Sequence, residues 1–192
     1  MNRERALLSL GIILTAIYFL DLIILAALNP DYSHMSNWVS DLGRIEAPHH
    51  EIFNVVGFLI GILFLLTGLG FFYSLHRITK RKVLAVFIGS FVSVFGINLI
   101  FAVLFPLPDP RHSAFGIGFL TFFAPILLAW ACWRIPNSRA FAILQILSFI
   151  LILLSSFGAN AFTNSGYLGL FQRIQAVIIF GWLTYSCLWL MR

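Results

Sequence analysis

The stretch ALLSLGIILTAIYFLDLIILAALN, residues 6–29, is apolar along almost its whole length and contains one charged residue, Asp21. A helix needs roughly 20 mostly apolar residues to cross the hydrocarbon core of a bilayer, and this stretch is long enough. The rest of the 192-residue chain is similar, with 60% hydrophobic and only 10% charged residues overall. Soluble domains have about 25% charged residues. The composition therefore excludes a soluble fold and predicts an integral membrane protein.

Apolar segments of spanning length follow one another along the chain and leave no room for a separate soluble domain. The breaks between them contain residues that end helices, such as Pro30, Pro106 and Pro136. Pro125 falls inside the fourth segment, where we expect it to kink the helix. We therefore predict one all-α domain, residues 1–192, built as a polytopic transmembrane bundle. Its six helices are predicted at residues 6–29, 52–75, 83–105, 114–133, 140–161 and 169–190.

Basic residues are distributed unevenly between the two ends of the predicted helices. Nine of the twelve fall on the side of both termini, and only Arg44, Arg111 and Arg173 fall on the other side. Short cytoplasmic loops carry an excess of Lys and Arg. We therefore expect a cell-membrane protein with both termini in the cytoplasm. The bilayer rather than nucleic acid is the expected partner of the +5 net charge, and no sequence feature indicates an oligomeric state.

Four apolar residues of the first outer loop recur at helical spacing, namely Met35, Trp38, Val39 and Leu42. Ser36 can serve as an N-cap before them, and Gly43 can end the helix after them. The pattern predicts a short amphipathic helix that lies on the outer leaflet with its tryptophan among the lipid headgroups. The alternative is an ordinary surface loop.

A short motif, P-D-x-x-H, occurs twice, and each copy follows a helix that runs outward. The first copy contains Asp31 and His34, and the second contains Asp109 and His112. Two histidines and two carboxylates brought together could bind zinc, and an open coordination position would activate a water molecule. The alternative is local, because Pro-Asp is also a common turn opener after a helix.

Polar residues within the predicted helices gather in the outer half of the membrane. Asp21, Asn98 and Arg173 lie about 12, 10 and 6 Å from the outer helix ends, at 1.5 Å per residue. A charge in hydrocarbon costs about 2.5–3.5 kcal/mol, so the two charged residues should face a partner or a wet cavity. One interpretation is an Asp21–Arg173 ion pair that locks the first helix to the sixth. The other is an outward-facing pocket floored by Asp21 and Asn98, in which Arg173, and Arg44 from the loop, hold a phosphate or carboxylate.

Several short motifs resemble the domain-of-unknown-function 998 family of membrane proteins. They are Tyr32-Ser33-His34, Ser40-Asp41-Leu42-Gly43 with Ala47-Pro48, Phe105-Pro106 with Asp109-Pro110 and His112, and Gly169 followed by Arg173. The resemblance implies a six-helix membrane domain with polar outer loops and no established activity. Family members often have Glu near the position of Asp41 and Cys near that of Pro108. This chain differs at both places, which removes any thiol from the outer site.

Three classes of function remain open. We favour a protein that binds a small polar ligand in the outward-facing pocket, such as a lipid headgroup or a small anion. The second class is a metal-dependent hydrolase or transferase acting on a lipid, with Asp41 as its acid or base and Arg173 as its anion holder. The third is a transporter or a structural subunit, although the inner half of the membrane is poor in polar residues.

Metal content separates the second class from the first. A zinc enzyme built on the two motifs should purify in detergent with near-stoichiometric zinc, and the double substitution His34→Ala/His112→Ala should remove it. Mass spectrometry of both forms makes the measurement. Zinc lost in the variant would favour the hydrolase, whereas metal-free protein in both forms would contradict it.

Overall fold

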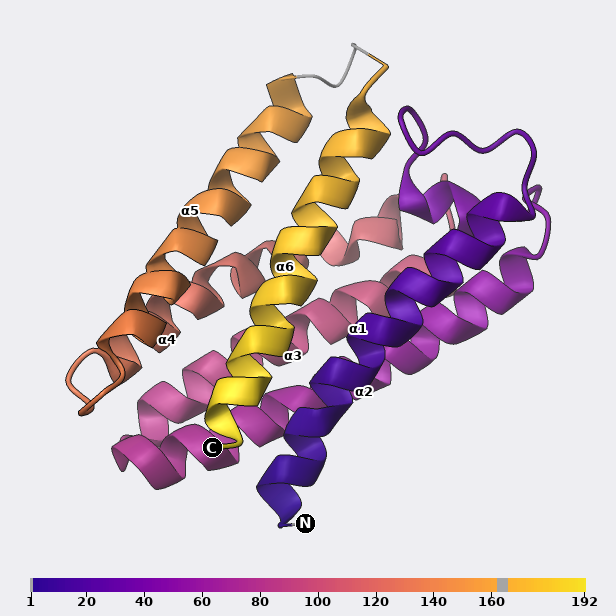
Figure 1. Ribbon diagram of the computed structural model, residues 1–192. Helices are drawn as coiled ribbons and strands as arrows, with labels where there is room; N and C mark the ends of the chain where they lie inside the picture. The colour runs from indigo at the N-terminus through magenta and orange to yellow at the C-terminus, as the bar shows by residue number, and fades with distance from the viewer. Residues whose placement is uncertain (1, 162–165) are drawn as a thin grey trace.

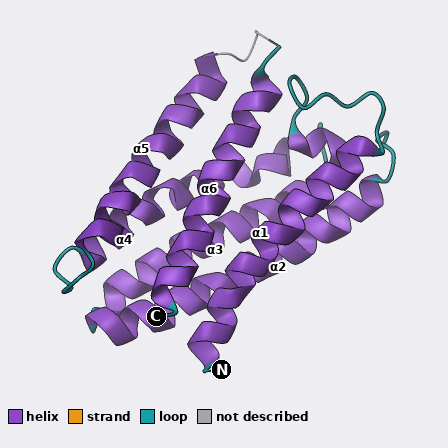
Figure 2. Ribbon diagram, viewed as in Figure 1, coloured by secondary structure: helices purple, strands orange, loops and turns teal. Residues whose placement is uncertain are grey.

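The computed structural model describes residues 2–161 and 166–192, and of residues 159–161 it describes the backbone only. It is helical throughout and contains no strand in the described ranges (Figures 1 and 2). Six helical segments are long and apolar enough to cross a membrane, which confirms the predicted fold. They are α1 (Arg3–Ala27), α2 (His50–Thr79), α3 (Lys82–Leu104), the segment of η2 (Pro110–Phe123) and α4 (Ala124–Cys132), α5 (Arg139–Ala161) and α6 (Leu168–Leu190).

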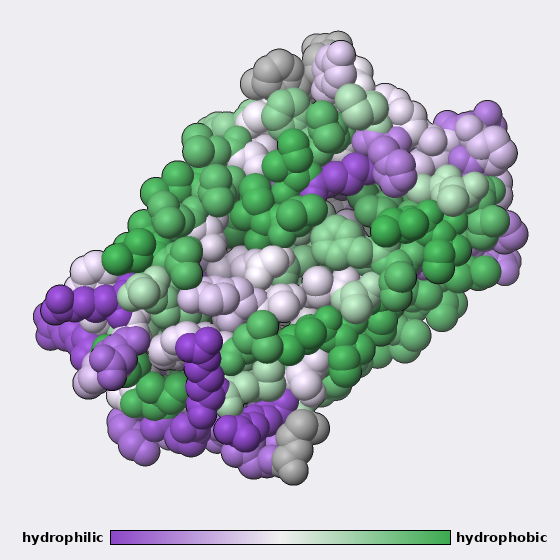
Figure 3. Space-filling view, viewed as in Figure 1, coloured by the Kyte–Doolittle hydropathy of each residue, from purple (hydrophilic) through white to green (hydrophobic). Residues whose placement is uncertain are grey.

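The outside of the bundle is apolar over the length of the helices. Large aliphatic side chains such as Leu20, Val55 and Leu154 are more than half exposed. Figure 3 shows hydrophobic surface across the middle of the visible face, with hydrophilic residues gathered toward its two ends. This distribution suits a bilayer, because only lipid can cover so much apolar surface without cost.

Both termini lie at one end of the bundle (Figure 1). Arg77 on α2 forms a 2.7 Å ion pair with Glu4 on α1. Arg5 donates a hydrogen bond to the carbonyl oxygen of Arg192. The α1–α2 loop, residues 28–49, therefore lies at the opposite end, together with the start of α6.

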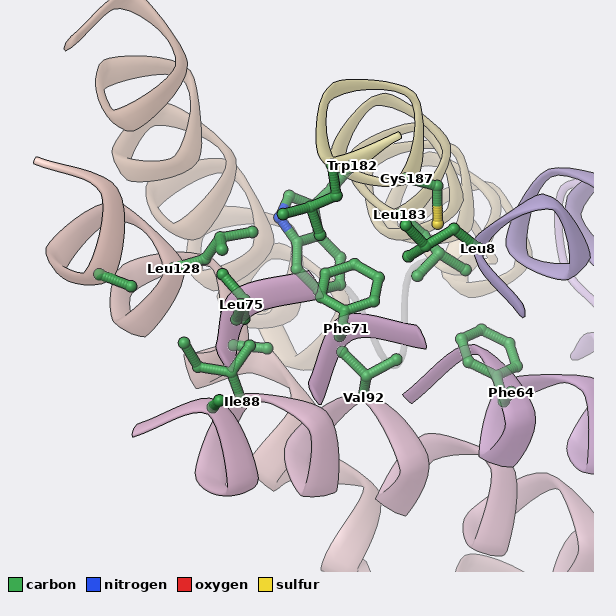
Figure 4. Close-up of a cluster of buried hydrophobic side chains, with 14 of the residues drawn as sticks. Leu8, Phe64, Phe71, Leu75, Ile88, Val92, Leu128, Trp182, Leu183 and Cys187 are labelled. Atoms are coloured by element: carbon green, nitrogen blue, oxygen red, sulfur yellow. The ribbon is translucent and has the colours of Figure 1, made fainter. Parts of the chain in front are cut away.

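Apolar side chains and glycines both contribute to the contacts between the helices. Large side chains fill the core, where Phe71 of α2 lies next to Trp182 of α6 with ring centroids 6.2 Å apart (Figure 4). Glycines bring α2 and α3 into close contact, since a Cβ atom on Gly89 would lie only 2.7 Å from the carbonyl oxygen of Gly68. Small residues at such a contact let two helix backbones approach each other closely in a membrane.

The fourth spanning segment differs from the single kinked helix that we predicted. Its first part, η2, is a 3₁₀ segment in which Ala114, Phe115 and Gly116 have positive φ angles. The α-helical part begins at Ala124, so Pro125 lies in the first turn of α4 and not inside a longer helix. Proline suits this position because it lacks the N–H that a first turn leaves unpaired.

The predicted helix in the α1–α2 loop is present but shorter. It is a five-residue 3₁₀ helix, η1 (Val39–Gly43), and it starts after Trp38 instead of Ser36. Val39 and Leu42 are 6% and 1% exposed and pack against Leu22 and Leu25 of α1. The helix therefore covers the end of the bundle, whereas the sequence predicted that it lies on the outer leaflet.

Candidate functional site

A cavity of about 240 Å³ lies beneath η1, between α1, α2, α3, η2 and α6. Its walls are mainly apolar. The exceptions come from different elements: Asp21 on α1, Asn54 on α2, Asn98 on α3, His112 on η2, and Gln172 and Gln175 on α6 all line it. Val39, Ser40 and Gly43 of η1 form its upper side. A mostly apolar cavity with a few convergent polar groups is the usual form of a small-molecule site.

The predicted pocket residues are only partly brought together. Asp21 and Asn98 line the cavity, as a pocket floored by these two residues requires. Arg173 and Arg44 lie outside the lining. The predicted ion pair between Asp21 and Arg173 does not form, because the guanidinium of Arg173 is directed to other acceptors.

Arg173 fastens the α1–α2 loop to the first turns of α6. Its Nε donates to Nδ1 of His34 at 3.1 Å, and one terminal nitrogen donates to the carbonyl oxygen of Asn37 at 2.8 Å. The same nitrogen donates to the carbonyl oxygen of Gly169 at 2.7 Å. The other terminal nitrogen donates to the hydroxyl of Tyr32. Four of the five guanidinium N–H groups thus donate hydrogen bonds, and three of these bonds end on acceptors of the loop.

The acceptors around Arg173 are neutral. Burial raises the pKa of Tyr32 to about 12, although Arg173 acts in the opposite direction, so the phenol keeps its proton. Desolvation lowers the pKa of His34, and the positive charge of Arg173 adds to this effect. A neutral imidazole can accept through Nδ1, as the bond from Arg173 requires. The arginine therefore has no carboxylate partner and acts through hydrogen bonds.

Two further residues at the start of α6 hold the loop, and sequence reasoning did not assign them this role. Gln172 accepts a 2.7 Å hydrogen bond from the backbone N–H of Val39, and the N–H of Leu170 donates to the carbonyl oxygen of Met35 at 3.0 Å. Gly169 permits this close approach, because a Cβ atom there would lie 2.5 Å from the carbonyl oxygen of Asn37. The only sequence signal is that Gly169 and Gln172 both precede the arginine within about one helical turn.

Asp41, the predicted acid or base, shapes the loop. Its carboxylate accepts a 2.8 Å bond from the backbone N–H of Trp38 and forms a 2.7 Å ion pair with Arg44. An acidic side chain at this position caps the first turn of η1. The carboxylate and the predicted ligand-binding arginine are thus paired with each other. A catalytic role for Asp41 stays a prediction.

The four predicted metal ligands have other partners or none. Asp109 pairs with Arg111 at 2.6 Å, and these hydrogen bonds lower the pKa of Asp109 to about 2. His112 donates from Nδ1 to the carbonyl oxygen of Phe105 at 3.0 Å, His34 accepts from Arg173, and Asp31 is exposed. Within residues 2–161 and 166–192, no three His, Cys, Asp or Glu side chains are grouped closely enough to hold a metal ion. The zinc site stays a prediction, and the observed bonds favour the turn interpretation of the motif.

Six spanning helices around a loop-covered cavity define a multi-pass membrane protein. Within that class, residues 11–189 match the family described as "Protein of unknown function (DUF998)", and the chain belongs to this family. The resemblance seen in the loop motifs is thereby confirmed. No curated protein and no solved structure matches the chain.

The close contact at Gly169 yields a direct test of the loop attachment. Gly169→Ala should push the loop away from α6 and destabilise its attachment by about 1–3 kcal/mol, as overpacking does elsewhere. Hydrogen exchange of the amides of residues 33–43 measures the effect as faster exchange.

Gly181→Ala is the matched control, because a Cβ atom there would have no neighbour within 4 Å. Alanine in place of a mid-helix glycine should leave loop exchange unchanged and stabilise the helix by roughly 0.5–1 kcal/mol. Equal loop exchange in the two variants would contradict the close attachment.

Proposed function

We propose that this membrane protein binds a small molecule with an apolar body and at least one hydrogen-bonding group in the cavity beneath η1. The observation that carries the proposal is the combination of cavity volume and polar groups that have no partner in the protein. In the described part of the chain, neither Asp21 nor Asn98 has a hydrogen bond or ion pair to another residue, although both line the cavity. Polar groups left without partners in an apolar setting are costly unless a ligand or water engages them.

The size of the cavity supports a ligand rather than a single water molecule. One water needs only about 10–15 Å³ of such space, and an engineered apolar cavity of about 150 Å³ binds benzene. A cavity of about 240 Å³ has room for a larger molecule. A soluble molecule and part of a membrane lipid both satisfy this requirement.

The position of the cavity supports access from the outer side of the cell membrane. It lies near the end of the bundle opposite to the termini, beneath η1. Nine of the twelve basic residues belong to the terminal side by sequence, which favours cytoplasmic termini. Toward that side the core is closed by fully buried Phe71 and Leu183. This packing gives a binding protein more support than a transporter.

The enzyme alternative has less support than ligand binding. Three of its four predicted metal ligands, His34, Asp109 and His112, are engaged elsewhere, as is its predicted acid or base, Asp41. Binding therefore remains the function that this geometry favours.

The test uses two fluorescent probes of the same shape, naphthalenemethanol and naphthylmethylamine, titrated into detergent-purified protein. We expect saturable binding of at least one probe. Ala102→Phe, which places a ring in the cavity, should abolish it by filling the space.

Ala27→Phe is the control, because Ala27 is exposed on the surface of α1 and does not line the cavity. It should bind like the wild type. Absence of saturable binding to the wild type, or binding that survives Ala102→Phe in a protein that remains folded by size-exclusion chromatography, would contradict the proposal.

A further inference from the structure

The cavity lining contains an acidic side chain. Asp21 is a half-buried carboxylate on α1, six residues before the helix ends at Ala27, or about 9 Å at 1.5 Å per residue. A carboxylate at this depth of a bilayer is expected to have a partner. The partner that the sequence predicted, Arg173, is occupied by the α1–α2 loop.

Among the residues that the structure describes, no Lys or Arg side chain pairs with this carboxylate. The residues that line the cavity include neither Lys nor Arg. Arg44, the nearest basic residue of the loop in sequence, is paired with Asp41 at 2.7 Å. In the described part of the chain, therefore, the cavity has a negatively charged group without a positive counterpart.

The walls next to Asp21 are aromatic. Tyr18 lies one helical turn before Asp21 on the same face of α1, and its ring stacks on that of Phe180 with centroids 4.1 Å apart. Phe95 of α3 lies 6.3 Å from Phe180, centroid to centroid. All three rings line the cavity. Aromatic faces attract a desolvated cation within about 6 Å through their quadrupoles.

His112 of η2 also lines the cavity and offers a hydrogen-bond acceptor. The Nδ1 atom of His112 lies 3.0 Å from the carbonyl oxygen of Phe105. Because a carbonyl can only accept, Nδ1 must carry the hydrogen, and Nε2 of the neutral ring is then an acceptor. Asp21 and His112 therefore both offer acceptors to a ligand that donates hydrogen bonds.

We infer that the ligand is an amphipathic amine, whose ammonium group pairs with Asp21 beside the rings of Tyr18 and Phe180 and whose apolar part fills the rest of the cavity. This inference rests on the binding function proposed above. The sequence predicted an anionic ligand held by Arg173 and Arg44, whereas the lining of the cavity favours a cationic one. An anion would meet the Asp21 carboxylate without a basic residue to offset the repulsion, and a bare metal ion would leave the apolar walls unfilled.

The test compares three naphthalene probes of one shape at neutral pH: naphthylmethylamine, which is cationic, naphthalenemethanol, which is neutral, and naphthoate, which is anionic. We expect the amine to bind about tenfold or more tightly than the alcohol, because hydrogen bonds to a charged partner are roughly twice as strong as neutral ones. Naphthoate should bind weakest.

Asp21→Asn keeps the shape of the side chain and removes its charge. It should weaken amine binding about tenfold or more, to the level of the alcohol, and leave alcohol binding within about threefold. Glu46→Gln is the matched control, because Glu46 is exposed and lies outside the cavity lining, and it should change neither affinity.

The outcomes separate this inference from the binding function. Equal affinities for amine and alcohol, with no effect of Asp21→Asn, would overturn the charge assignment and leave the binding function intact. No saturable binding of any probe would overturn both. Tighter binding of the amine that depends on Asp21 would support both.

A competition experiment identifies the source of the amine. The amine probe is titrated into wild-type protein in phosphatidylglycerol nanodiscs with and without phosphatidylethanolamine, whose headgroup carries an ammonium group. Weaker probe binding in the presence of phosphatidylethanolamine would support a lipid amine, and unchanged binding would support a soluble amphipathic amine.

Discussion

The guanidinium of Arg173 donates four hydrogen bonds at the start of α6, and three of them end on the α1–α2 loop. Because these bonds draw the loop over the end of the bundle, η1 comes to rest against α1 and closes the cavity on that side. The remaining features of the site depend on this attachment. Without it, Val39 and Leu42 would lose the contacts that bury them, and Asp21 would face an open hollow.

The same attachment determines the electrostatics of the cavity. A guanidinium and a carboxylate that share a membrane leaflet would normally pair, because each is costly to leave alone in hydrocarbon. Here the arginine is satisfied by neutral oxygen and nitrogen acceptors, and Gly169 lets these acceptors come close. Asp21 is consequently available to a ligand. The chain thus keeps the cation that holds the loop apart from a carboxylate that lines the cavity at similar depth.

Much of the fold could be predicted from the sequence, because hydrophobic length and proline breaks reflect constraints that the bilayer imposes on each helix separately. The depth of Asp21 and Asn98 followed from the same counting, and both residues line the cavity. The partner of Arg173 could not be predicted. Depth along a helix does not say which way a side chain points around it, and one of the three acceptors on the loop, the carbonyl oxygen of Asn37, is a backbone group that no residue type reveals. The left-handed turn at Ala114 and Phe115 likewise carries no sequence signal, since these residue types rarely adopt positive φ.

The most direct measurement of this account is a disulfide cross-link between the loop and α6 in isolated membranes. Met35 and Leu170 are joined by a backbone hydrogen bond of 3.0 Å and have exposed side chains, and the native cysteines Cys132 and Cys187 are buried. With a protease site added in the loop between α4 and α5, the Met35→Cys/Leu170→Cys variant should keep its two fragments together under oxidising conditions and release them on reduction. Fragments that separate without reductant, while both cysteines react with maleimide, would show that the loop does not lie on α6 and would contradict the account.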